Sequence, residues 1–139
     1  MSLSNATETQ VLQMLLEGTD PSYRSGATAY LALVTDAAGA VNEATPIANE
    51  CTYTGYARVA ITKATDWTVT GDTAVNDNLI QFGKRTDAGA TQTATAFVIV
   101  DTASGAINLG IIGTLAAELD INQNIQPQFA GGDLTVTAA

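Results

Sequence analysis

The stretch Ala94-Thr-Ala-Phe-Val-Ile-Val100 decides the fold, because it is an almost continuous apolar run with the length of one strand. Such a run is typical of a strand in the middle of a sheet that is covered on both faces. The turn Asp101-Thr-Ala-Ser-Gly105 follows directly, and residues 107–115 return as a second apolar segment. We therefore predict a central hairpin, in which Gly110 and Gly113 mark bulges or close approaches of another chain segment.

Shorter strand patterns lie on both sides of this hairpin. Residues 27–35 alternate, with Leu31 and Leu33 on one face and Tyr30 and Val34 on the other. Further strands are predicted at residues 56–62, 67–71, 79–82 and 134–137. Short strands without intervening helices predict an all-β fold, an antiparallel, jelly-roll-like β-sandwich of about seven to nine strands.

The N-terminal region holds the one convincing helix pattern, at about residues 6–17. Its apolar side chains recur with a period near 3.6 and form one stripe. They are Val11, Leu12, Leu15 and Leu16. Asn5 followed by Glu8 resembles a capping box, and Gly18 is a typical helix stop. A helix of about three turns is marginal alone, so we expect its leucine face to pack on the end of the sandwich or on a partner.

The length of 139 residues fits one domain, which we place at 1–139 with the sandwich at about 27–137. Residues 40–54 show no clear period and contain Pro46, so they are predicted to form a surface loop. The N-terminus lacks the basic and apolar regions of a signal peptide, and no apolar stretch could span a bilayer. We expect a protein that is made in a cytosol.

The charge balance excludes two classes of partner. The chain has 14 acidic and five basic residues, no histidine and a net charge of −9. Five cations cannot neutralise a run of phosphates, which argues against a nucleic-acid partner. An anionic membrane surface would repel the chain for the same reason.

Catalytic chemistry finds little support in the residue types. Without histidine there is no Ser-His or Cys-His pair, and the lone Cys51 follows Glu50, whose charge raises the pKa of a thiol. Asp66, Asp72 and Asp77 could line a glycosidase cleft, but the last two lie in turn-like contexts. We therefore expect no enzyme and no cofactor.

Metal binding is limited by the same composition. Zinc and copper sites need histidine or cysteine ligands that the chain lacks. Two runs could offer oxygen ligands to calcium, but neither has the EF-hand spacing, and solvated turns are the favoured interpretation. They are Asp36, Asn42 and Glu43, and Asp72, Asn76, Asp77 and Asn78. We expect no resident metal.

Three groups of residues are candidates for contact with a protein partner. The first is the helix face of Leu12, Leu15 and Leu16. The second is the pair Tyr53 and Tyr56, which could stack on a glycan but by default packs in the core or at a subunit interface. The third is the dipeptide Lys84-Arg85, either an anchor for an acidic partner or a plain exposed turn.

Several segments, taken in order, resemble a family of small virion proteins of tailed bacteriophages, variously labelled head-decoration, minor tail or tail-fibre-like proteins. They are Leu3-Ser-Asn-Ala-Thr-Glu8 with the leucine-rich helix, Ala27-Thr-Ala-Tyr-Leu-Ala-Leu-Val-Thr-Asp36, Tyr53-Thr-Gly-Tyr-Ala-Arg-Val59, Phe97-Val-Ile-Val-Asp-Thr-Ala-Ser-Gly105, Ile111-Ile-Gly-Thr-Leu115 and Asp133-Leu-Thr-Val-Thr137. The chain departs from the family pattern at residues 36–52, which lack the expected Asp-Pro turn, and at residues 118–130, which run longer.

The resemblance implies a β-sandwich structural protein of the virion and brings no catalytic residue with it. We expect a decoration or cement protein that binds the major capsid protein or other virion proteins on the outside of the head. The alternative is a tail-associated or fibre-like module that contacts the host receptor. Analogy with shell cement proteins implies a homo-oligomer, with a trimer preferred.

Overall fold

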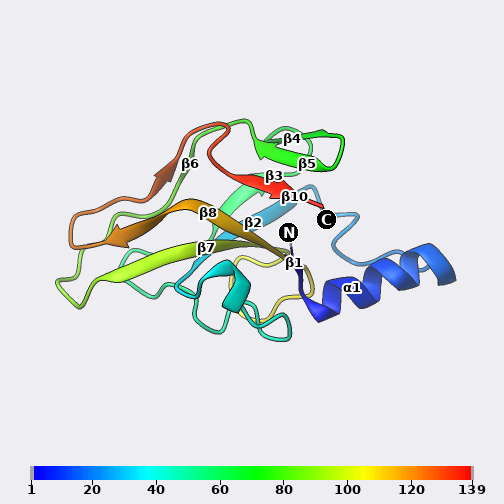
Figure 1. The fold of residues 1–139 in the computed structure, drawn as a ribbon, viewed down its shortest axis with the longest axis horizontal. Coiled ribbons are helices and arrows are strands. Elements are labelled where there is room, and N and C mark those ends of the chain that lie inside the picture. The colour runs from blue at the N-terminus through cyan, green and yellow to red at the C-terminus, as the bar shows by residue number, and fades with distance from the viewer. Residues whose placement is uncertain (1, 139) are drawn as a thin grey trace.

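In the computed structural model, which describes residues 2–138, the apolar run forms the middle strand of a five-stranded sheet (Figure 1). The order of strands across this large sheet is β1-β8-β7-β2-β3, and every pairing is antiparallel. The strands are β1 (Ser2–Leu3), β2 (Thr28–Val34), β3 (Val59–Thr62), β7 (Gln92–Val100) and β8 (Gly110–Ile121). The predicted central hairpin is thus the β7–β8 pair, and residues 96–100 are all buried.

Two smaller antiparallel sheets complete the β structure. One has the order β10-β5-β4 and the other pairs β6 with β9. Their strands are β4 (Trp67–Thr70), β5 (Thr73–Asn76), β6 (Ile80–Gln81), β9 (Gln128–Phe129) and β10 (Thr135–Thr137). Besides the N-terminal helical segment, the described residues contain one 3-10 turn, η2 (Ala38–Ala40). The mostly β fold with antiparallel sheets and a short N-terminal helix confirms the predicted fold class. The short strands β1, β5 and β9 were not predicted.

The large sheet has an apolar core on each of its faces. On one face, Leu31, Leu33 and Phe97 pack with residues of the smaller sheets, among them Ile80 and Val136, and form the main core. On the other face, a second and smaller core is built from Val34, Val41, Ala96, Val98, Val100 and Ile112. The alternation predicted for β2 is confirmed, because Leu31 and Leu33 enter the main core while Val34 enters the second.

The two cores show that residues 40–54 are more than a surface loop, because Val41 belongs to the second core while Cys51 and Tyr53 belong to the main core. Val41, Pro46, Cys51 and Tyr53 are buried in this segment, and Val34 forms an isolated β-bridge with Glu50. The segment has no regular period because it lies across the large sheet as a covering layer. The predicted absence of strands within it is confirmed, but the predicted surface position is wrong for these four side chains.

At both predicted glycines of β8, Gly110 and Gly113, a side chain from another segment packs closely against the strand. A Cβ atom at Gly113 would lie 2.1 Å from the ring of Phe97, the residue that faces it on β7. A Cβ at Gly110 would lie 2.8 Å from the side chain of Ser4. The two glycines therefore let an aromatic ring and the start of the helix pack directly on β8.

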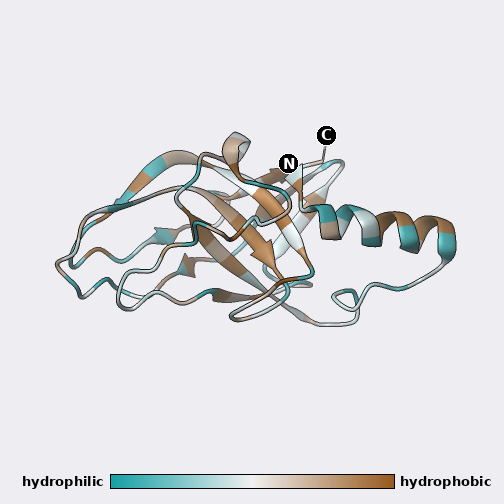
Figure 2. Cartoon of the chain, turned by 90° about the horizontal axis from the view of Figure 1, so that it is seen from below, coloured by the Kyte–Doolittle hydropathy of each residue, from teal (hydrophilic) through white to brown (hydrophobic). Residues whose placement is uncertain are grey.

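The helical segment begins with α1 (Asn5–Leu12) and continues as the π-helical turn η1 (Gln13–Glu17). Gly18 ends it in the left-handed conformation with φ of 69°, as predicted. The predicted cap was wrong by one residue: the Oγ of Ser4 accepts a hydrogen bond from the Thr7 amide at 3.3 Å. Figures 1 and 2 show the helix projecting from one end of the β structure. In the part of the chain that the structure describes, no helix is long and apolar enough to cross a membrane.

Candidate functional site

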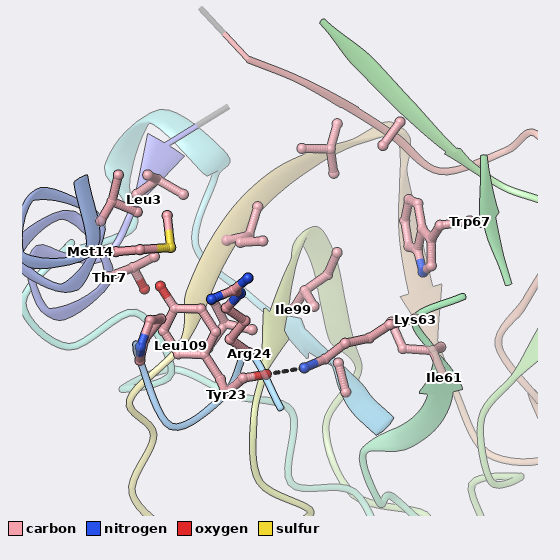
Figure 3. Close-up of a pocket in the computed structure, with 16 residues that line it drawn as sticks. Leu3, Thr7, Met14, Tyr23, Arg24, Ile61, Lys63, Trp67, Ile99 and Leu109 are labelled. Atoms are coloured by element: carbon pink, nitrogen blue, oxygen red, sulfur yellow. Dashed lines mark hydrogen bonds between the residues drawn. The ribbon is translucent and has the colours of Figure 1, made fainter. Parts of the chain in front are cut away.

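An apolar groove opens beside the projecting helix and has a volume of about 490 Å³ (Figure 3). The helix forms one wall with Thr7, Val11 and Met14. Ile99 of β7 and Ile111 of β8 line the groove from the large sheet. Further lining residues come from β3, β4, β5 and β10, and they are Ile61, Trp67, Ala74 and Val136. The groove is therefore a place where the main core is open to the surface.

The helix wall is fixed to the large sheet by one buried threonine. The Oγ1 of Thr7 accepts a hydrogen bond from the Gly110 amide at 2.8 Å and lies 2.9 Å from the Oγ of Ser4. The amide of Ser4 in turn donates to the Gly110 carbonyl at 2.8 Å. These contacts anchor the first turn, so the remaining turns extend outward along the groove.

Two cations are the only charged residues among those that line the groove. They are Arg24, which pairs with Asp20 across one turn, and Lys63, whose ammonium group donates a hydrogen bond to the carbonyl of Tyr23 (Figure 3). The segment that carries Tyr23 and Arg24 runs back from the end of the helix to β2. The groove therefore has an apolar lining and a rim that carries Lys63 and the Arg24–Asp20 ion pair.

The predicted leucine face lies outside the groove. The side chains of Leu12, Leu15 and Leu16 are 58%, 68% and 80% exposed, whereas Val11 and Met14 are half-buried in the groove wall. The sequence pattern placed Val11 on the leucine stripe, but the structure turns it inward with Met14. We expected the leucines to be covered by the end of the sandwich or by a partner. The end of the sandwich of the same chain leaves them exposed.

Tyr53 and Tyr56 belong to the interior. The hydroxyl of Tyr53 donates to the Gly83 carbonyl at 3.0 Å. The hydroxyl of Tyr56 accepts from the Leu33 amide at 3.1 Å and donates to Glu50 at 2.7 Å. Burial raises the pKa of both phenols, to about 12 for Tyr53. The default expectation of core packing is thus confirmed for these two rings.

Glu50 and Arg58 form a bidentate ion pair beside Tyr56. The Nε–Oε1 distance is 2.8 Å and the Nη2–Oε2 distance is 2.9 Å. Arg58 also donates to the carbonyls of Thr102 and Gly105, which ties the hairpin loop after β7 to this pair. The hydrogen bonds to Glu50 raise the pKa of the guanidinium.

The two residues of the dipeptide Lys84-Arg85 lie in different environments. Lys84 is exposed, but Arg85 is 2% exposed and donates to the Ile121 carbonyl at 2.6 Å and to Asp87 at 2.6 Å and 3.0 Å. The interpretation of both residues as an exposed turn is wrong for Arg85. Asp87, two residues further on, provides the counter-charge that permits this burial.

The groups considered for chemistry serve local structure. Asp66 accepts from the Thr62 amide at 2.6 Å, and Asp72 and Asp77 accept from the hydroxyls of Thr73 and Thr68. Asn76 is buried, and its amide group bonds to Asn78, Ala130 and Leu134. Cys51 is buried, and burial together with the charge of Glu50 raises the pKa of its thiol to about 11, which confirms the predicted direction. Within residues 2–138 no three acidic or cysteine side chains come together in a way that could hold a metal ion.

The sequence pattern missed the groove because most of its lining residues are unremarkable one at a time. Trp67, Ala74 and Val136 lie on three different short strands of one small sheet. Only the spacing of Thr7, Val11 and Met14, at i, i+4 and i+7, could have indicated a second helix face.

The fold and the groove define a β-rich protein that presents a helix with exposed leucines and an open apolar groove at one end. A family model described as podophage GP4 fiber I protein gp80 matches residues 2–137. The chain belongs to this family and is a bacteriophage virion structural protein, which confirms the coarse part of the resemblance. A comparison with curated proteins gives no match.

Proposed function

We propose that this chain is a structural subunit of a virion fibre or of a tail-associated assembly. The observation that carries the proposal is the match of a fibre-protein family over residues 2–137. The description of the family favours the alternative given by the sequence over head decoration, which the sequence placed first. In this role the protein works through shape and binding rather than through a reaction.

The architecture supports such a role in two ways. The hairpin β7–β8 lies at the centre of the β structure, and Arg58 and Arg85 tie it to other segments through hydrogen bonds to the carbonyls of Thr102 and Ile121. The helix and groove at one end offer apolar surface, which is what a subunit needs to join other virion proteins. We assign attachment to this end of the molecule and expect the partner to be protein.

Labelling of intact particles tests the proposal. Gold-labelled antibodies against the purified chain are added to virions, and the positions of the gold particles are recorded by electron microscopy. We expect label on fibres or on the tail. Label spread evenly over the head would show that the chain decorates the capsid and would overturn the fibre assignment.

A further inference from the structure

The end of the helix and the groove both present apolar side chains, but the helix carries acidic residues and the groove lining carries basic residues. Residues 5–17 contain two acidic residues, Glu8 and Glu17, and no basic residue. The partial negative charge at the C-terminal end of a helix adds to that of Glu17. The groove has the opposite character, since Arg24 and Lys63 are the only charged residues that line it.

These two cations stand out in a chain with a net charge of −9. Of its five basic residues, Arg58 and Arg85 are held in buried or largely buried ion pairs. Of the other three, Arg24 and Lys63 lie at the groove; Arg24 is paired with the exposed Asp20, and the ammonium group of Lys63 donates to the Tyr23 carbonyl. An occupant that is apolar and acidic is therefore favoured there over one that is apolar and basic.

The helix of the same chain cannot supply that occupant. Val11 and Met14 already form part of the groove wall, and the helix projects away from the β structure (Figure 2). Leu15, Leu16 and Glu17 at its end are exposed. Gly18 reverses the chain directly after them. The exposed end of the helix can enter a groove only on another molecule.

We propose that the groove receives the helix end, residues 15–17, of a second copy of this chain. The two leucines enter the apolar lining, and Glu17 meets Lys63 and Arg24 at the rim. Because every copy has one helix end and one groove side by side, two copies can exchange helices reciprocally, or several can close a ring. The proposal deepens the fibre assignment by naming a partner, and it rests on that assignment only for its biological setting.

Self-association of the purified full-length chain tests the proposal. Sedimentation equilibrium of the natural sequence is expected to give a closed oligomer at micromolar concentrations. Leu15→Asp with Leu16→Asp is expected to weaken association by at least about a hundredfold while the circular dichroism spectrum stays unchanged. The matched control is Leu79→Asp, which alters a leucine that is 58% exposed outside the helix and is expected to associate normally.

Groove variants separate this arrangement from a contact between two helices. Ala74→Phe fills the groove and leaves every helix residue in place, so we expect it to abolish association. If Ala74→Phe folds and still associates like the natural chain, the leucines contact one another and the proposal is wrong. Should this variant fail to fold, Lys63→Glu provides the same test at the rim, where unchanged association would equally contradict the proposal.

A charge-reversal rescue and a mixing experiment make the test specific. Lys63→Glu should weaken association, and adding Glu17→Lys in the same chain should restore it. A chain with a defective helix end mixed with a chain with a defective groove should form a pair through the one intact contact. Failure of either rescue, or a monomer for the natural chain at about 100 μM, would overturn the proposal. A monomer that still labels fibres would leave the fibre assignment standing.

Discussion

Gly113 is the residue at which the central hairpin is most sensitive to an added methyl group. Its missing Cβ would lie 2.1 Å from the Phe97 ring, which belongs to the opposite strand and is fully buried. We predict that Gly113→Ala lowers the free energy of unfolding by about 1–3 kcal/mol, because the ring cannot move without disturbing the main core. Urea denaturation measures this change.

A second glycine gives the control. Gly39→Ala meets no atom within 4 Å and should leave the stability of the protein almost unchanged. A Gly113→Ala variant as stable as Gly39→Ala would show that the Phe97 ring does not pack this closely against Gly113.

Cys51 is predicted to be unreactive in the folded protein. Burial and the neighbouring carboxylate of Glu50 raise the pKa of the thiol to about 11, so only a very small fraction is thiolate at pH 8. We expect dithionitrobenzoate to label the folded chain far more slowly than the chain in concentrated urea. Equal rates in the two conditions would contradict the burial of this side chain.

Asp87 makes the stability of the fold depend on pH. The hydrogen bonds from Arg85 and from the amides of Thr54 and Gly89 hold the pKa of this carboxyl well below its usual range. Since the folded pKa lies below the unfolded value of about 3.9, the ionised group stabilises the fold above pH 4. This contribution is lost as the pH falls below that value.

The matching experiment compares thermal unfolding of the natural chain and Asp87→Asn between pH 7 and pH 2. The variant should melt at a lower temperature at pH 7, because Arg85 stays buried without its counter-charge. The difference in melting temperature should shrink as the pH falls. A difference that is constant across this range would show that the ionised carboxylate contributes nothing.

At the scale of elements, the exposed leucines separate assembly from folding. Leu12→Asp with Leu16→Asp is predicted to change the free energy of unfolding by no more than about 0.5 kcal/mol, since both side chains are exposed. Leu33→Ala removes a fully buried side chain of β2 and should cost about 2–5 kcal/mol. A helix variant that unfolds like Leu33→Ala would show that the helix face closes the core after all.

The sequence patterns predicted the elements whose conformation is favoured by their own residues. The apolar run of β7, the alternation of β2 and the stop at Gly18 are local signals, and all three appear in the structure. Strands β1, β5 and β9 have two to four residues and exist because partner strands lie beside them. The residues of these three strands show no clear alternation of their own, and their stabilisation comes from pairing.

The candidate site was predictable only in part for the same reason. The leucines of the helix were identified from their period, but the groove is assembled from residues far apart in the sequence. Arg85 was placed at the surface because a cation in a polar loop is usually exposed. Its burial depends on Asp87 and on the Ile121 carbonyl, which the fold brings from a distant strand.

On the scale of the whole molecule, charge is distributed unevenly. Arg58 and Arg85 are withdrawn into ion pairs, and Arg24 and Lys63 line the groove. Most of the remaining charge is acidic, which disfavours contact with nucleic acid and leaves the apolar end as the surface best suited to a protein partner. We expect this end to be the surface through which the subunit binds other virion proteins.

The number of copies per virion tests the fibre assignment most directly. Isotope-dilution mass spectrometry of purified particles can measure this chain against the major capsid protein. A fibre or tail-associated subunit predicts from a few to a few dozen copies, because fibres are attached at few positions. Hundreds of copies, in a fixed ratio to the capsid protein, would contradict the assignment and identify the chain as a decoration of the head shell.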